Sequence, residues 1–206
     1  MIILCIASDN YKIKYLPCIK SQEQYCAKNN YNYVLISGPD DSRNWKRAKI
    51  EELCNLITSY DDDIVLIDGD CYIKDTCPPF TDFIIADKSI YYANGKSGRL
   101  NSGFLYFKNN IDSKQFINEL AEKLKKPVPR GNGYFVTAEG ENGHIIWLKD
   151  DWEKKEKNVF QEIPNLWNCS RKSCKKDAYI LHFTNDLRKE IYNYNENLRT
   201  SQKNKK

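Results

Sequence analysis

Three apolar runs divide the first part of this chain into a regular alternation. Residues 2–7, 31–37 and 64–67 are rich in Ile, Leu, Val and Tyr, and turn-forming residues follow each run. Between the runs, residues 15–28 and the segment after Ser42 carry apolar side chains at helical spacing, with Ser42 as the expected N-cap. This alternation of strands and helices predicts an α/β fold with a largely parallel sheet.

The rest of the chain continues this mixture of short elements. Further strands are predicted at residues 83–86, 90–93, 104–107, 159–160 and 178–181, and helices at 112–125, around 145–148 and from Asp186 onward. The sequence holds no internal repeat and no clean linker, so we expect one domain over residues 1–190. Residues 191–206 are expected to form a basic C-terminal tail.

Composition excludes several classes of protein. No segment reaches the ~18 apolar residues needed to span a bilayer. The net charge of +4 is small, and the basic residues are scattered along the chain, so a nucleic-acid partner is not expected. The N-terminal run lacks the basic region of a signal peptide. We therefore expect a cytoplasmic protein, or a domain of a longer one.

Eight cysteines are present without any CxxC pair, so the spacing of a zinc site is missing. In a chain without an export signal, reduced thiols are expected. Two pairs, Cys71 with Cys77 and Cys169 with Cys174, are close enough in sequence for a disulfide to remain an alternative.

An Asp-Gly-Asp triplet follows the third apolar run. Asp68 and Asp70 lie two residues apart, and strand side chains at i and i+2 face the same side. Two such carboxylates make a site for a hard divalent cation, and Gly69 would let a ligand approach the backbone. The alternative is a hairpin turn, because Asp-Gly is a strong turn dipeptide and residues 71–73 could form the return strand.

A histidine stands at the end of another predicted strand. His182 follows residues 178–181 directly, as Asp68 follows residues 64–67. The carboxyl ends of strands in such sheets form the usual ligand site. Two carboxylates and an imidazole suit Mn²⁺ or Mg²⁺, and the imidazole favours Mn²⁺. The other histidine, His144, lies in a helical stretch and is assigned a structural role.

With these residues in place, the chain resembles nucleotide-sugar glycosyltransferases of the GT-A fold, which carry a DxD motif. It is similar to retaining enzymes of the glycogenin/galactosyltransferase type and of the GMA12/MNN10 type. The resembling segments occur in the same order as in those enzymes. They are residues 45–50, 64–70, 101–105, 163–168 and 180–184.

The resemblance implies a Rossmann-like domain with a mixed, mostly parallel sheet. It implies transfer of a sugar from a nucleoside diphosphate donor, here a UDP-sugar, to a saccharide or glycan acceptor, with retention of configuration. The implied metal ligands are Asp68, Asp70 and His182. The implied donor-binding residues are Ala7, Ser8, Asp9, Lys49, Asp68, Gly69, Asp70, Asn101 and Ser102.

The implied catalytic residues are Glu139, Glu141 and Asn142, where the sequence departs from the Asp-Gln run usual in the family. A second departure follows His182, where Arg188 or Lys189 would supply the cation for the diphosphate. Two alternatives remain. One is a phosphatase of the haloacid-dehalogenase type, although position 72 is Tyr where that motif has Thr or Val. The other is a non-catalytic nucleotide-sugar-binding module.

Overall fold

A six-stranded sheet forms the centre of the molecule. The structure, a computed structural model, describes residues 1–85, 87–129, 140–192 and 194. In the order β2-β1-β3-β6-β5-β7, the strands are Asn32–Gly38, Ile2–Ser8, Ile64–Asp68, Leu100–Phe107, Ile90–Asn94 and Phe160–Ile163.

Five of these strands run in one direction, and β6 alone runs in the other. β1 pairs in parallel with β2 and β3, whereas β6 pairs antiparallel with both β3 and β5. The apolar side chains of β1 and β3 are buried on both faces, as expected of central strands covered by helices on each side. The expected mixed, mostly parallel sheet in a single domain is confirmed.

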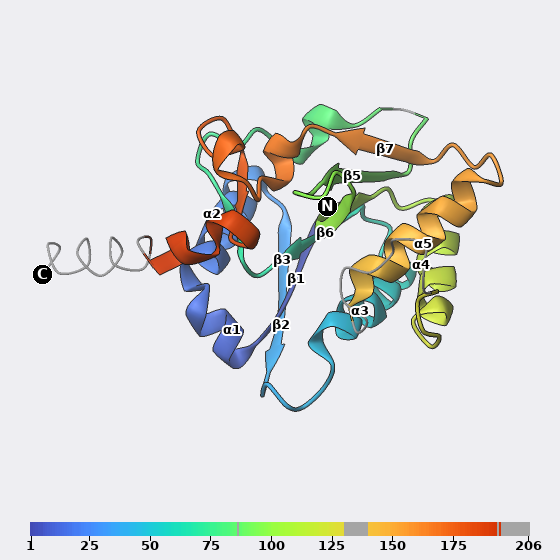
Figure 1. Ribbon diagram of the computed structural model, residues 1–206, viewed down its shortest axis with the longest axis horizontal. Helices are drawn as coiled ribbons and strands as arrows, with labels where there is room; N and C mark the ends of the chain where they lie inside the picture. Colours follow the sequence, from blue (N-terminus) through green and yellow to red (C-terminus); the bar gives the residue numbers. More distant parts are fainter. Residues whose placement is uncertain (86, 130–139, 193, 195–206) are drawn as a thin grey trace, which may run out of the picture.

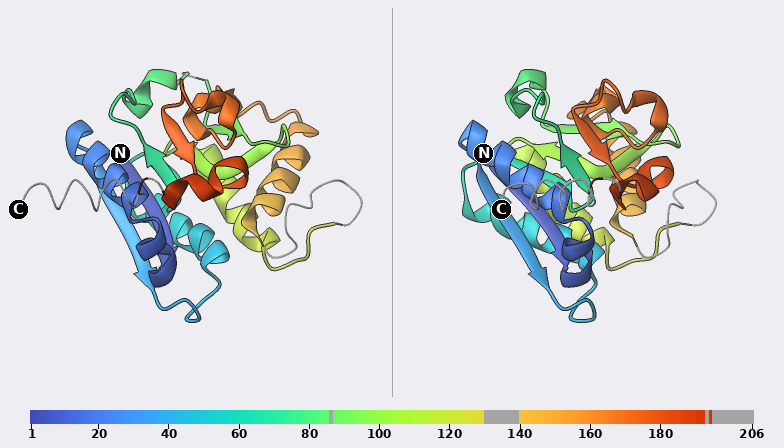
Figure 2. Two further views of the ribbon diagram at one scale, coloured as in Figure 1. Left: turned by 60° about the vertical axis from the view of Figure 1, so that its left-hand side comes forward. Right: turned by 90° about the vertical axis from the view of Figure 1, so that its left-hand side faces the viewer.

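Helices cover both faces of the sheet (Figures 1 and 2). On one face, α3 (Trp45–Ser59), α4 (Ile111–Lys123) and α5 (Glu141–Glu153) pack over Ile2, Leu4 and Leu66. On the other face, α1 (Asp9–Lys14) and α2 (Leu16–Asn29) follow β1 directly, and Ile19 and Tyr25 of α2 pack there with Ile3 and Val65. Within the described ranges, no helix is long and apolar enough to cross a membrane.

A small second sheet lies beside the main one. β4 (Cys71–Ile73) pairs antiparallel with β8 (Ile180–His182). Short 3-10 helices in the described part of the chain are η1 (Phe80–Phe83), η2 (Asn165–Asn168), η3 (Lys172–Cys174) and η4 (Asn185–Glu190). A disulfide joins Cys169 to Cys174, so the expectation of reduced thiols is wrong for this pair, while Cys71 and Cys77 are free.

Several local predictions are wrong at their edges. Asn44, not Ser42, caps α3, because its side chain accepts hydrogen bonds from the backbone N–H groups of Lys46 and Arg47. The helix predicted at 15–28 is α2, Leu16–Asn29, whereas the short α1 before it, Asp9–Lys14, was not predicted. The strand predicted at 83–86 is absent from its described residues, 83–85. There η1 ends, and the backbone of Ile85 bonds the Tyr91 hydroxyl.

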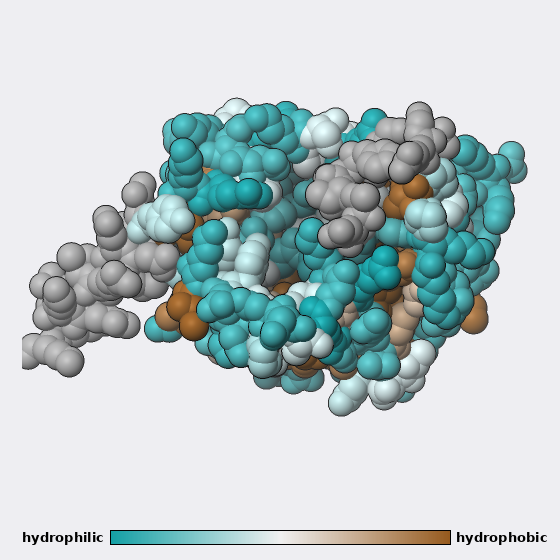
Figure 3. All heavy atoms as spheres, turned by 60° about the horizontal axis from the view of Figure 1, so that its bottom comes forward, coloured by the Kyte–Doolittle hydropathy of each residue, from teal (hydrophilic) through white to brown (hydrophobic). Residues whose placement is uncertain are grey.

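The reversed direction of β6 decides which residues meet at the functional edge. β1 and β3 end at Ser8 and Asp68, and the antiparallel β6 begins at that same edge with Leu100. A space-filling view towards this edge shows hydrophilic side chains around a central hollow (Figure 3). Residues far apart in the sequence therefore converge at the carboxyl end of the sheet.

Candidate active site

The Asp-Gly-Asp segment is a bend between two strands of different sheets. Asp68 ends β3, and the following β4 pairs with β8 rather than folding back on β3, so the hairpin interpretation is wrong. The buried amide of Gln22 fixes the bend, because its Nε2 donates to Asp68 O at 2.9 Å and to Cys71 O at 2.8 Å. A Cβ at Gly69 would lie only 3.2 Å from Ala7 Cβ.

The pairing of β4 with β8 brings the histidine to the carboxylates. His182 lies opposite Cys71 in this ladder. Its Nε2 is 3.2 Å from Asp70 Oδ1 and 3.7 Å from Asp68 Oδ2. The structure thus brings together the three residues predicted as metal ligands.

A chain of hydrogen bonds behind His182 fixes which of its nitrogens carries the proton. The Gly103 backbone N–H can only donate, and it bonds Asn101 Oδ1 at 2.9 Å. The Asn101 carbonyl can only accept, so the Asn168 group that reaches it at 3.3 Å, and Asn101 Oδ1 at 2.8 Å, is Nδ2. Asn168 Oδ1 therefore accepts from His182 Nδ1 at 2.9 Å. In the neutral ring this leaves the Nε2 lone pair directed at Asp70.

A buried lysine links the aspartate motif to the start of α5. Lys49 Nζ contacts Asp68 Oδ1 and donates to Glu141 Oε1 at 2.8 Å. Ser102 adds a hydroxyl hydrogen bond to the same Oε1 at 3.0 Å, and its backbone N–H donates to Asn142 Oδ1 at 2.8 Å. The first turn of α5 is thereby attached to β6 and α3.

Charge and burial compete in setting the protonation of this cluster. Burial opposes ionisation of Glu141, but the Lys49 ammonium outweighs it and holds the pKa of that carboxyl below its usual value. For Asp70 burial again opposes ionisation, yet the His182 ring lowers its pKa. Burial dominates at Asp68, whose pKa is raised despite Lys49, with the nearby Asp70 charge adding to the rise. Asp68 is therefore the carboxyl of this cluster whose ionised form would gain most from additional positive charge.

The donor set fits a hard divalent cation. Asp70 Oδ1 is buried and, when the His182 ring is neutral, has no hydrogen-bond donor among the described residues. Such an orphaned carboxylate oxygen, beside a second carboxylate and an imidazole nitrogen, suits Mn²⁺ or Mg²⁺. Cys71 lies in the same cluster. Burial raises the pKa of its thiol far above the ordinary value, and the thiol donates to Gly103 O, so it stays protonated.

A cavity of about 300 Å³ opens next to this cluster. Of the predicted donor-binding residues, Ala7, Ser8, Lys49, Asp68 and Gly69 line it. Of the predicted catalytic residues, Glu141 and Asn142 line it, and Glu139 lies outside the described residues. Asp9 is exposed at the start of α1 and is not part of the lining.

Sequence reasoning missed several residues of the site. Tyr11 and Lys46 line the cavity, Gln22 holds the bend, and Asn168 orients His182. Asn168 stood within a resembling segment without an assigned role, and Trp45, which also lines the cavity, was interpreted only as a helix residue. His144 is structural as predicted, because its buried ring nitrogens lie 2.8 Å from Lys126 O and 3.2 Å from Gly140 O.

Comparison with known proteins identifies the architecture. No protein-family model and no curated protein sequence matches the chain. The chain is similar to the solved structure of a glycosyltransferase involved in glycosylation of the major capsid of PBCV-1, with a TM-score of 0.68 and 15% identity over 93% of this chain and 97% of that one.

Two further solved structures extend the similarity. For the galactosyltransferase LgtC, solved with donor and acceptor sugar analogues, the TM-score is 0.59 with 12% identity over 90% of this chain and 88% of that one. For the glycosyltransferase GlyE of Streptococcus pneumoniae TIGR4 the TM-score is 0.59 with 12% identity, and the match covers 94% of this chain but 59% of GlyE. The chain therefore has the fold of the GT-A glycosyltransferases.

Proposed function

We propose that this protein is a metal-dependent glycosyltransferase. It would move a sugar, a hexose in the simplest case, from a nucleoside diphosphate donor to a saccharide or glycan acceptor. The observation that carries the proposal is the convergence of Asp68, Asp70 and His182 around an orphaned buried oxygen at the edge of a cavity. The similarity in fold to known glycosyltransferases supports the same conclusion.

Three side chains would hold the metal. Asp68 and Asp70 offer carboxylate oxygens and His182 offers Nε2, whose lone pair the Asn168 hydrogen bond keeps available. When bound, Mn²⁺ or Mg²⁺ supplies positive charge that stabilises the diphosphate leaving group. Asn168 and Gln22 would position these ligands without touching the substrate.

The cavity has the lining that a nucleotide needs. Tyr11 and Trp45 provide aromatic rings for a base, and Lys46 provides a cation for the phosphates. Ala7 and Ser8 lie where β1 ends and would border the nucleoside, as would Gly69. We propose UDP as the nucleotide on the resemblance stated above, with Asp9 a candidate partner for the base.

The sugar would lie between β6 and α5. Asn101 Oδ1 is occupied by two hydrogen bonds, so its amide N–H₂ remains to donate to a sugar hydroxyl. Glu141 is held as a carboxylate by Lys49 and Ser102. It would attack the anomeric carbon as the C–O bond to the diphosphate breaks, which inverts the configuration. The acceptor hydroxyl would then displace Glu141 with a second inversion, its proton passing to the released diphosphate, so that the configuration is retained overall. In the alternative route Glu141 would stabilise an oxocarbenium-like species, and the acceptor hydroxyl would attack from the face that the diphosphate leaves, which also retains the configuration. Asn142 would assist from the same helical turn.

The experiment is a nucleotide-sugar screen with Mn²⁺, combined with thermal unfolding. UDP with Mn²⁺ at about 100 times the dissociation constant should stabilise the protein by about 2.7 kcal/mol. The stabilisation should vanish in Asp70→Asn, which keeps the size of the side chain, and persist in Asp75→Asn, whose carboxylate is exposed. NMR of the product then gives the anomeric configuration.

Two outcomes would contradict the proposal. Hydrolysis of a phosphomonoester without any response to UDP and Mn²⁺ would indicate the phosphatase alternative. Binding of nucleotide sugars without turnover, by wild type and by Glu141→Gln alike, would indicate a binding module. A glycosyltransferase requires donor hydrolysis or transfer that Glu141→Gln reduces at least 100-fold, about 2.7 kcal/mol.

A further inference from the structure

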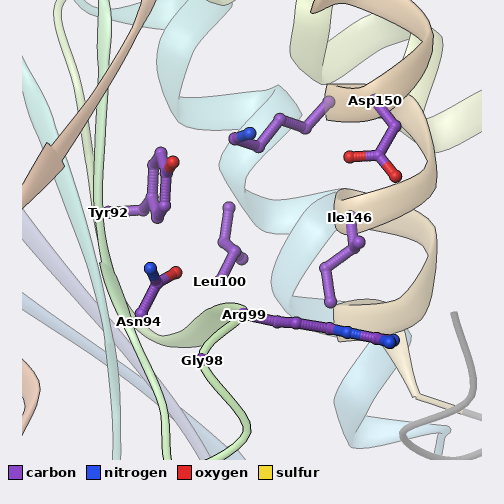
Figure 4. Close-up of a pocket in the computed structure, with 8 residues that line it drawn as sticks. Tyr92, Asn94, Gly98, Arg99, Leu100, Ile146 and Asp150 are labelled. Atoms are coloured by element: carbon purple, nitrogen blue, oxygen red, sulfur yellow. The ribbon is translucent and has the colours of Figure 1, made fainter. Parts of the chain in front are cut away.

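A second cavity lies between the β5–β6 loop and α5 (Figure 4). Its volume is about 320 Å³, within the range of small-ligand pockets. Tyr92 and Asn94 come from β5, Arg99 and Leu100 from the loop and the start of β6, and Ile146 from α5. None of these residues belongs to the lining of the first cavity.

The two cavities lie on the same stretch of β6 and α5. Leu100 of the second cavity is followed directly by Asn101 and Ser102 of the candidate active site. On α5, Asn142 lines the first cavity, while Ile146 and Asp150 line the second at spacings of four and eight residues. Residues at such spacings share one helix face. At ~1.5 Å per residue, Asp150 lies about 12 Å along the helix from Asn142.

The lining combines apolar side chains with polar side chains that have no hydrogen-bond or ion-pair partner among the described residues. Tyr92, Leu100 and Ile146 are nearly buried and offer apolar contact. Against them, the side chains of Asn94, Arg99 and Asp150 have no hydrogen bond or ion pair with any described residue. Lys149 is already engaged, since its Nζ is 2.7 Å from Glu153 Oε1 and 5.2 Å from the Tyr92 ring centroid.

This set of groups matches the chemistry of a saccharide. A sugar ring presents apolar C–H faces and hydroxyls that both donate and accept. Asp150 accepts, Arg99 donates and Asn94 does both. A phosphate-bearing ligand fits less well, because the Asp150 carboxylate would face its charge.

We propose that this cavity binds a sugar residue of the acceptor, next to the residue that is glycosylated. The proposal rests on the proposed function and adds the place from which the acceptor enters, along β6 and α5. Binding there would direct an acceptor hydroxyl towards Asn101 and Glu141. Two of the polar lining residues, Arg99 and Asp150, can be changed at the surface without removing any hydrogen bond between described residues.

The kinetic test uses the double variant Arg99→Gln/Asp150→Asn. With a donor and an acceptor found by screening, the KM for the acceptor should rise at least tenfold, and the ratio of transfer to donor hydrolysis should fall by a similar factor. Asp61→Asn, an exposed carboxylate ahead of β3 and so at the opposite edge of the sheet, should change neither. An acceptor KM within twofold of wild type in the double variant would overturn the proposal.

A binding test separates this proposal from the assignment of a glycosyltransferase. In protein with ¹³C-labelled Ile and Leu methyl groups, a panel of methyl glycosides of glucose, galactose, mannose and N-acetylglucosamine is titrated without donor. At least one should shift the methyl signals of Ile146 and Leu100 but not that of Ile57, which is buried on α3. If no glycoside in the panel shifts Ile146 or Leu100, the cavity is not a saccharide site, whatever the activity.

Discussion

Replacing Asn168 should weaken binding of the proposed metal, although Asn168 is not one of the three proposed ligands. Its Oδ1 accepts the proton of His182 Nδ1 at 2.9 Å, and the residue is 1% exposed. Asn168→Leu removes this acceptor. The neutral His182 ring then no longer prefers to carry its proton on Nδ1, so the Nε2 lone pair is less often available to the metal. A buried hydrogen bond contributes about 0.5–1.5 kcal/mol. At 1.4 kcal/mol per tenfold, the Mn²⁺ dissociation constant should rise about twofold to tenfold from this bond alone, and up to ~100-fold if the ring reorients.

The assay is a Mn²⁺ titration followed by electron paramagnetic resonance of the free ion. Asn168→Asp keeps an oxygen next to Nδ1 and should bind Mn²⁺ more tightly than Asn168→Leu. Asn165→Leu, an exposed change in the same 3-10 helix, should bind like wild type. Thermal unfolding checks that Asn168→Leu is folded, because the unsatisfied ring nitrogen should cost about 1–3 kcal/mol.

NMR tests the reasoning directly, because the chain contains two histidines. At alkaline pH, in ¹⁵N-histidine-labelled protein without metal, His182 should carry its proton on Nδ1, which donates to Asn168 Oδ1. A proton on Nε2 of His182 would refute the argument, as would wild-type Mn²⁺ affinity in folded Asn168→Leu.

Three further changes follow from the same site. Gly103→Ala places a Cβ 2.3 Å from His182 Cε1, so the ring must move, and the thermal stabilisation by UDP with Mn²⁺ should be lost. Lys49→Met removes the charge that lowers the pKa of Glu141. Because a carboxylate must be ionised to act, the acid limb of the pH–rate profile for donor hydrolysis should move to higher pH; an unmoved limb contradicts this role. Cys174→Ser opens the disulfide to Cys169 and should cost about 2 kcal/mol by loop-closure entropy. Reductant should lower the melting temperature of wild type but not of this variant, and an unresponsive wild type would refute the disulfide.

Much of the functional edge could be predicted because its signals are local. Asp68 and His182 each follow an apolar run, and a strand that ends in a polar residue at the carboxyl edge can be read from a few neighbouring positions. The central strands β1 and β3 were predicted for the same reason. The pairing of residues 71–73 could not be predicted in the same way. Both the hairpin alternative and the observed structure make a strand of these residues. The two differ in the partner strand, and the observed partner, β8, lies about 110 residues away in the sequence.

The remaining residues depend on contacts that no short window contains. Asn101-Ser102-Gly103 has weak strand propensity, yet it lies within β6 because the strand is paired on both sides of it, through Leu100 with Asn94 of β5 and through residues 104–107 with β3. Asn168 acquires its role only through the positions of His182 and Asn101, which lie 14 and 67 residues away in the sequence. Side chains that orient ligands are therefore harder to predict than the ligands themselves.

The direction of β6 links the proposed metal site to the proposed acceptor cavity. β6 contains 8 residues, which at ~3.3 Å per residue span about 26 Å. Were it parallel to β3, its first residues would lie at the opposite edge, about that distance from Asp68. Because β6 runs antiparallel, Leu100 lies in the second cavity and Ser102 donates a hydrogen bond to Glu141. Gly103 donates to Asn101, and this hydrogen bond fixes the orientation of Asn168 and, through it, of His182. A single reversed strand thus supplies one wall of the proposed acceptor path and the support of His182, a proposed metal ligand. Changes in β6 should therefore affect acceptor use and metal affinity together, whereas changes in α5 beyond its first turn should affect acceptor use alone.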